Sequence, residues 1–271
     1  MFTASKLLCK VTILTVLSAS TLLSSAALAE NTSAKAQENR GDNRERIEPK
    51  GFLYGIGIGL NQEPYKGFDY RFIPLPILGY RSENFSVLGP FVTYDALSFG
   101  DIEITLQAAP RFQGFDESDS DIFANMDERK FSMDAGIGVK YERNDWKINF
   151  TGMADILGRS DGYQLKTNIG RVFRKGPIFF EPNLSVSYLD DNHVDYYYGV
   201  KAHEVNPNTY QYSGESTVNT TLGFSVATPI FLEGFTRIAI DHTWYGSGIT
   251  DSPLVDEKRS WGARLLFSKF F

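Results

Sequence analysis

His193 lies among three carboxylates, Asp190, Asp191 and Asp195, and this is the group in the sequence best suited to chemistry. Such a group could bind a metal ion or, beside a serine, activate a nucleophile. The chain contains no HExxH motif, no histidine pair at metal-binding spacing and no serine in a nucleophile elbow. We therefore interpret the segment as a solvated acidic loop and predict no catalytic, cofactor-binding or metal-binding residues.

Glycines occupy alternate positions at Gly55, Gly57 and Gly59, an arrangement that superficially resembles a phosphate-binding loop. The G-x-G-x-x-G spacing is absent and no helical pattern follows, so a dinucleotide site is not expected. The alternation instead predicts one face of a β-strand.

A dense acidic run covers residues 116–121. It lacks the central glycine and the terminal glutamate of an EF-hand calcium loop. We interpret it as a solvated loop, with divalent cations that bridge it to lipopolysaccharide phosphates as the alternative.

Three adjacent tyrosines, Tyr196, Tyr197 and Tyr198, precede Gly199 and Val200 in a long polar segment. Tyrosine combines a large apolar ring with a hydroxyl group, so this patch suits a binding surface on an external loop. The alternative is an aromatic girdle, or a loop that folds into the mouth of a barrel.

The first 29 residues have the pattern of a secretory signal peptide. Lys6 and Lys10 precede an uncharged apolar stretch at 11–23, and a small-x-small cleavage pattern ends at Ala29. Cleavage is therefore predicted between Ala29 and Glu30, so the mature protein is exported.

The predicted mature chain begins with a polar segment. Residues 30–50 contain almost no apolar side chains, which predicts a flexible periplasmic tail. The single cysteine, Cys9, is lost with the signal peptide, so disulfides and cysteine-based metal sites are excluded from the mature chain.

The composition narrows the classes of partner and of membrane span. The chain has 27 Lys+Arg and 33 Asp+Glu residues, a net charge of −6 that argues against a nucleic-acid partner. Beyond the signal peptide no stretch of 18 apolar residues occurs, which excludes helical spans. The 21 Phe and 14 Tyr residues suit the aromatic girdles of a membrane barrel.

Alternating apolar and polar residues dominate the chain beyond the tail and predict β-strands. In residues 217–227, Val218 and Leu222 share one face, whereas Asn219 and Thr221 share the other. The alternation leaves open whether the apolar face is buried in a sandwich or faces lipid. The pattern marks eleven strands: 51–60, 69–80, 85–95, 101–113, 131–142, 145–156, 161–173, 177–189, 217–227, 233–245 and 259–271.

The end of the chain favours a membrane barrel. Phe271 is the last residue and Phe267 precedes it on an alternating strand, which resembles the signal read by the outer-membrane assembly machinery. Tight turns also alternate with long polar loops, as in outer-membrane barrels. Because bacterial barrels have even strand numbers, we predict a transmembrane antiparallel β-barrel of about 12 strands over residues 51–271, with 10 as the alternative and the counting error within 60–100.

Short motifs in the chain resemble those of the MipA/OmpV family of MltA-interacting outer-membrane proteins. A Gly-rich strand, a Tyr-x-Gly and a Pro-Leu-Pro occur in the family's order near the start of the barrel. The later motifs comprise Tyr197, Tyr198, Gly199, Val200, Ser252, Pro253 and Val255.

This resemblance implies a non-enzymatic scaffold in the cell outer membrane of a Gram-negative bacterium, contacting lipid and lipopolysaccharide. It further implies that the scaffold joins a lytic transglycosylase to a penicillin-binding peptidoglycan synthase. A small channel and a surface adhesin or receptor remain as alternatives.

Overall fold

The computed structural model of the protein describes residues 50–271. The predicted signal peptide at 1–29, its cleavage site between Ala29 and Glu30, and the tail at 30–50 except for its last residue lie outside the described residues.

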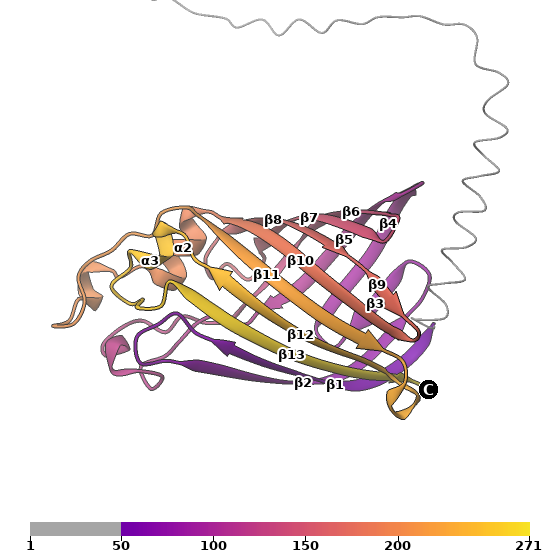
Figure 1. Ribbon diagram of the computed structural model, residues 1–271. Helices are drawn as coiled ribbons and strands as arrows, with labels where there is room; N and C mark the ends of the chain where they lie inside the picture. Colours follow the sequence, from indigo (N-terminus) through magenta and orange to yellow (C-terminus); the bar gives the residue numbers. More distant parts are fainter. Residues whose placement is uncertain (1–49) are drawn as a thin grey trace, which may run out of the picture. The chain divides into compact units, whose positions relative to one another are not determined.

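The described chain forms one antiparallel sheet that closes on itself (Figure 1). β1 pairs with β13, and β10 pairs with β11, so the sheet has no end. The strands are β1 (Gly51–Gln62), β2 (Tyr70–Arg81), β3 (Phe85–Leu88), β4 (Phe91–Phe99), β5 (Ile102–Arg111), β6 (Ser132–Arg143), β7 (Trp146–Asp155), β8 (Tyr163–Arg171), β9 (Phe173–Lys175), β10 (Ile178–Leu189), β11 (Thr217–Thr228), β12 (Phe235–Trp244) and β13 (Arg259–Phe270).

β8 and β9 are two parts of one barrel strand, interrupted at Val172. Both pair with β10, but the ladder skips Glu181 and Pro182 together with the residues opposite them, Val172 and Arg171. Proline has no N–H to donate, which explains an interruption at this point. The thirteen segments therefore make twelve barrel strands, and the predicted even number is confirmed.

The strand missing from the sequence pattern lies where the counting error was expected. The predicted strand at 85–95 is two strands, β3 and β4, joined by Gly89 and Pro90. Gly89 has φ 59°, a left-handed conformation that glycine adopts without strain. The tight turn lies within an apolar run, so the alternation pattern does not reveal that the chain reverses there.

The outward face of the barrel is apolar. Leu78 is 74% exposed, Ile238 54% and Leu222 53%, and each belongs to the outward set of its strand. A continuous exposed apolar belt of this kind suits hydrocarbon rather than water. No helix within residues 50–271 is long and apolar enough to cross a membrane.

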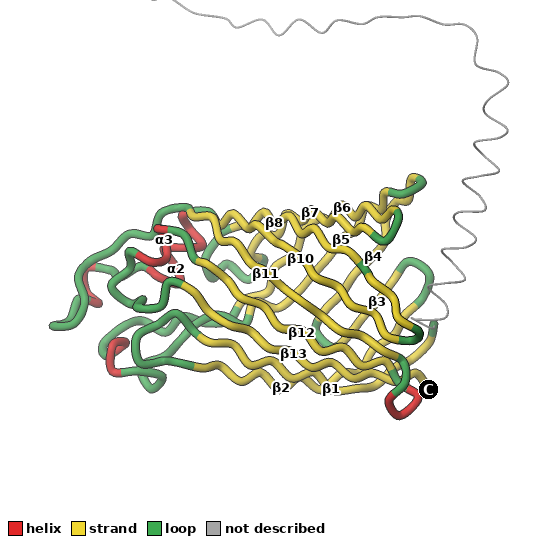
Figure 2. The backbone as a smooth tube through the Cα atoms, viewed as in Figure 1, coloured by secondary structure: helices red, strands yellow, loops and turns green. Residues whose placement is uncertain are grey.

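The two ends of the barrel differ in their connections (Figure 2). The terminal rim, where β1 begins and β13 ends, carries mainly tight turns, together with η3 (Phe231–Glu233). The loop rim carries the long connections and the remaining short helices, η1 (Asp121–Phe123), α2 (Asp191–Tyr198), η2 (Ala202–Glu204) and α3 (Ser247–Thr250).

Candidate functional site

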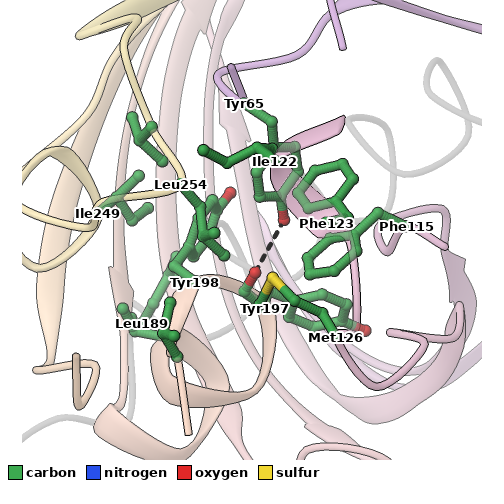
Figure 3. Packing of buried hydrophobic residues seen from close by; sticks show 13 residues of the cluster. Tyr65, Phe115, Ile122, Phe123, Met126, Leu189, Tyr197, Tyr198, Ile249 and Leu254 are labelled. Carbon is green, nitrogen blue, oxygen red and sulfur yellow. Dashed lines mark hydrogen bonds between the residues drawn. The ribbon is translucent and has the colours of Figure 1, made fainter. Parts of the chain in front are cut away.

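Four connections at the loop rim fold together into one buried cluster, which we call the cap. The cap comprises residues 63–69, 112–131, 190–216 and 245–258. These connections leave the ring between β1 and β2, β5 and β6, β10 and β11, and β12 and β13, so their convergence spans the mouth of the barrel. Its apolar core, drawn in Figure 3, contains Tyr65, Phe115, Ile122, Phe123, Met126, Val194, Tyr197, Tyr198, Val200, Ile249, Leu254 and Val255, together with Leu189 at the end of β10.

Helix α2 carries the tyrosines into this core. The Asp190 carboxylate caps the helix by accepting hydrogen bonds from His193 N at 3.1 Å and Tyr163 N at 2.9 Å. Helical spacing of three and four residues then places Val194, Tyr197 and Tyr198 on one buried face. The segment interpreted as a solvated loop is therefore a capped helix whose His193 is buried.

Tyr197 and Tyr198 contact the β1–β2 connection from across the ring. The Tyr65 hydroxyl donates to Tyr197 O at 3.0 Å, and the rings of Tyr65 and Tyr198 stack with centroids 5.3 Å apart. Tyr65 also meets Phe123 edge-on at 5.5 Å. Stacked and edge-on rings add to the apolar burial, so this contact is a main stabilising element of the cap.

The Ser-Pro segment closes the same core. Ser252 Oγ donates to Tyr198 O at 2.6 Å and accepts from Leu254 N at 3.2 Å. Lys66 Nζ donates to Pro253 O at 2.7 Å, and Val255 forms an isolated β-bridge with Tyr65. Together with Val200, which bridges to Tyr212, the residues Tyr197, Tyr198, Gly199, Ser252, Pro253 and Val255 are thus brought into one cluster.

A buried ion pair lies beside this core. Arg129 Nη2 donates to Glu204 Oε2 at 2.8 Å, and the two side chains are only 2% and 0% exposed. Glu204 also accepts from Lys201 N at 2.8 Å and Asp127 N at 3.1 Å. Asp127, His203 and Glu204 are close enough to hold a metal ion, but these bonds already occupy both oxygens of Glu204. We therefore assign the group a structural role.

Burial sets the titration behaviour of the cap. Burial raises the pKa of Tyr65 and of Tyr198 well above the usual range, which keeps both phenols neutral. Burial, assisted by the Arg111 charge, lowers the pKa of His193 well below its usual value. Burial also raises the pKa of Glu63, against the attraction of Arg71. None of these directions poises a general base beside a nucleophile.

The acidic run lies on the surface of the cap. Asp116 accepts hydrogen bonds from Ser118 within the run, and these lower the pKa of its exposed carboxyl group. Ser120 Oγ donates to Lys66 O at 2.7 Å and fastens the run to the β1–β2 connection.

Charged side chains line the barrel interior and pair with one another. Arg264 Nη1 lies 2.7 Å from Asp241 Oδ1, and Lys147 Nζ lies 3.4 Å from Glu181 Oε2. The inward-pointing Arg264 side chain is still 56% exposed, so the lumen retains space for solvent.

The terminal phenylalanines lie on the terminal rim. Phe267 pairs with Ile56 in the outward set of β13. Phe271 is 87% exposed, and its N–H donates to Phe52 O at 3.0 Å. Their role as an assembly signal stays a prediction.

The family model described as MltA-interacting protein MipA matches residues 54–271 of the chain. The chain belongs to the MipA family. MltA-interacting protein of Escherichia coli (strain K12) is 25% identical over 215 residues, which cover 78% of this chain and 85% of that protein. Outer membrane protein OmpV of Vibrio cholerae is 26% identical over 147 residues, covering 54% of this chain and 57% of that one.

Among solved structures, the alignment with the NanC porin covers 80% of this chain and 99% of the porin chain, with 8% identity and a TM-score of 0.43. OmpV is named an outer membrane protein, and this chain is an outer-membrane β-barrel of the MipA family. Its apolar belt therefore faces lipid.

Proposed function

We propose that this MipA-family barrel anchors a murein enzyme of the lytic transglycosylase class at the periplasmic face of the outer membrane. The observation that carries the proposal is the 25% identity to MltA-interacting protein over 85% of that protein's length. In this arrangement the terminal rim faces the periplasm. A penicillin-binding peptidoglycan synthase is the further partner that the scaffold would hold. In this role the barrel would act as a scaffold and the bound enzyme would carry out the chemistry.

A docking surface for such an enzyme is available on the terminal rim. The β11–β12 connection, residues 229–234, is longer than the two-residue β6–β7 turn. At its tip Ile230, Phe231 and Leu232 are 55%, 60% and 78% exposed. Exposed apolar side chains held on an ordered turn are suited to the centre of a protein interface.

The test is binding of purified mature protein, in detergent, to a purified lytic transglycosylase. Replacing Phe231 and Leu232 together with serine should weaken binding by about tenfold or more, as expected for an apolar interface centre. The matched control replaces Ile156 and Leu157, 56% and 47% exposed on the loop rim, and should leave affinity unchanged. Deleting residues 30–50 measures the contribution of the tail. Failure of the unaltered protein to bind would overturn the proposal.

A small channel is the second candidate, and the solvent-exposed Arg264 inside the lumen favours it. Conductance across planar bilayers tests it. A channel should give conductance steps, and these should become larger when the cap loops are shortened. The absence of conductance with both the unaltered protein and the shortened variant would count against a channel. An adhesin role would require ligands for exposed cap residues such as Tyr210, which is 59% exposed.

A further inference from the structure

One edge of β2 is unpaired over most of its length. β2 pairs with β1 from end to end, but its other edge pairs with β3 only at residues 79–81. Leu78 O accepts one more hydrogen bond, from Gly89 N at 3.1 Å. Beyond it, residues 70–77 have no strand ladder on that side within the described chain. Such an edge is costly in a membrane barrel, because lipid cannot hydrogen-bond to the backbone.

Two prolines occupy the unpaired edge. Backbone groups of successive strand residues point to opposite edges, so Pro74 and Pro76, in phase with Leu78, direct theirs to the open side. Neither proline has an N–H, and an added strand would therefore lack two donors. This edge is protected against pairing with a second copy of the chain.

The upper part of β5 forms the opposite border. Its ladder with β4 ends at Val92 and Ala108. Asp101 O accepts from Glu142 N, so odd-numbered residues of β5 direct their backbone groups toward β6. Even-numbered residues therefore face the β4 side, and Pro110 offers no N–H there. β3 and β4 end below this level, so no strand lies between β2 and β5 there within the described chain. We call the region between β2 residues 70–78, the β3–β4 turn and β5 residues 108–111 the lateral gap.

The wall around the lateral gap is apolar on its outward face. Its inward face is apolar up to the loop rim, where Arg71 pairs with Glu63 and Arg111 pairs with Asp134. Outward, Phe72 is 61% exposed and Leu78 74%. The inward apolar residues of β1 to β4 around the gap include Leu53, Ile73, Leu75, Ile77, Leu88 and Phe91. The interior of β7, β10, β12 and β13 carries charged side chains instead. Below the arginines at the loop rim, the lumen side of β2 beside the missing ladder is therefore apolar.

We propose that the lateral gap binds an acyl chain of the surrounding outer-membrane lipid, laid against Ile73, Leu75 and Phe91. The gap opens within the lipid-facing belt, between the outward rings of Phe72 and Tyr80, so lipid chains are the molecules that meet it. An acyl chain buries the inward apolar side chains that water would leave wet. It needs no hydrogen-bond donors from the proline-bearing edge, while lumen water still reaches the carbonyl groups. This inference is independent of the proposed scaffold function.

Single cysteines can test the proposal cleanly, because the predicted mature chain has none. Leu75→Cys at the gap, Thr221→Cys on the inward face of β11 and Leu78→Cys on the lipid face are each labelled with bimane. Leu75 and Thr221 are both inward and partly buried, so they form a matched pair. The folded proteins are placed in phosphatidylcholine vesicles with or without bromine on the acyl chains, since bromine quenches bimane on contact.

The expected result is loss of bimane fluorescence at Leu75→Cys in brominated vesicles, approaching the loss at Leu78→Cys, with Thr221→Cys unaffected. If bimane at Leu75→Cys is quenched no more than bimane at Thr221→Cys, the proposal is overturned. This includes equal quenching of both, because lipid would then enter the lumen without using the gap. Protection of Leu78→Cys together with a disulfide-linked dimer would show that a second copy covers the edge, which also overturns it. Heat-dependent gel mobility confirms that each variant is folded.

Discussion

Replacing Glu204 with glutamine tests whether the buried ion pair holds the cap together. The Glu204 carboxylate accepts from Arg129 Nη2 through Oε2 and from Asp127 N through Oε1. Glutamine keeps the size of the side chain but removes the charge and one of the two acceptors. Arg129 would then remain at 2% exposure without its counter-charge.

The structure sets the magnitude of this loss. Removing one partner of a buried ion pair costs about 3–5 kcal/mol, since the remaining charge stays desolvated. A local opening that becomes easier by this amount is about 10²- to 10⁴-fold more populated. The strands are not part of the pair, so the barrel itself should keep its heat-dependent gel mobility.

Hydrogen exchange in detergent measures the opening directly. Suitable reporters are the amides of Val200, which donates to Tyr212 O at 2.8 Å, and Phe115, which donates to Arg129 O at 2.9 Å. Neither amide is bonded to Glu204, so their exchange reports opening of the cap rather than a lost acceptor. Both should exchange faster in Glu204→Gln by the stated factor.

An exposed pair in the same cap provides the control. Lys201 Nζ and Asp127 Oδ2 also lie 2.8 Å apart, but their side chains are 55% and 52% exposed. Asp127→Asn should therefore change the reporter exchange by no more than the effect of about 0–1 kcal/mol typical of surface pairs. If Glu204→Gln has no larger effect than Asp127→Asn, the assigned role of the buried pair is wrong.

Three further predictions address the cap and the wall. Ser252→Ala leaves Tyr198 O and a backbone N–H unsatisfied in the core, so protease resistance of the cap should fall by about 1–3 kcal/mol of local stability; unchanged resistance would contradict this. Burial lowers the pKa of His193, so cap protection should be constant above the ordinary histidine value of about 6.5 and be lost as pH falls toward the folded pKa. In His193→Gln, protection of the cap in hydrogen exchange should no longer depend on pH in this range. If the pH dependence persists, another group is responsible for it. Leu222→Arg on the lipid face should destabilise the barrel to urea by about 2–4 kcal/mol, whereas Thr221→Arg in the lumen should be tolerated.

The strands were predictable from the sequence because their period is local. Residues 217–227, taken as a strand from alternation, correspond to β11 at Thr217–Thr228. Whether Leu222 faces lipid or a core is not encoded in that alternation, because both environments favour the same residues. The closed sheet and its exposed belt resolve this question.

Prolines blurred the strand pattern between residues 60 and 100, and the turn at Gly89 and Pro90 caused the miscount. Pro74 and Pro76 weakened the strand pattern of β2, although the strand spans them without a break. Their phase at the unpaired edge explains why β2 tolerates them. Pro90, beside Gly89, forms a turn in what looked like one strand.

The cap was beyond local sequence patterns. Asp190 at the start of α2 is a recognisable N-cap and could have indicated the helix. Nothing local signals that Arg129 meets Glu204, or that Tyr65 meets Val255, since these partners are far apart in the chain. The cluster of motif residues became visible only once closure of the sheet brought the loops together.

The cap also has a consequence for the order of folding. Tyr65 follows β1 and Val255 precedes β13, and the two meet where the first and last strands of the barrel pair. In a sheet that has not yet closed, these two strands lie at opposite edges. They are also the most distant strands in the sequence, so pairing them carries the largest entropic cost of loop closure. We therefore expect the cap to form after β1 and β13 have paired, and a fluorescent probe at Tyr65 would report when the sheet closes into a barrel.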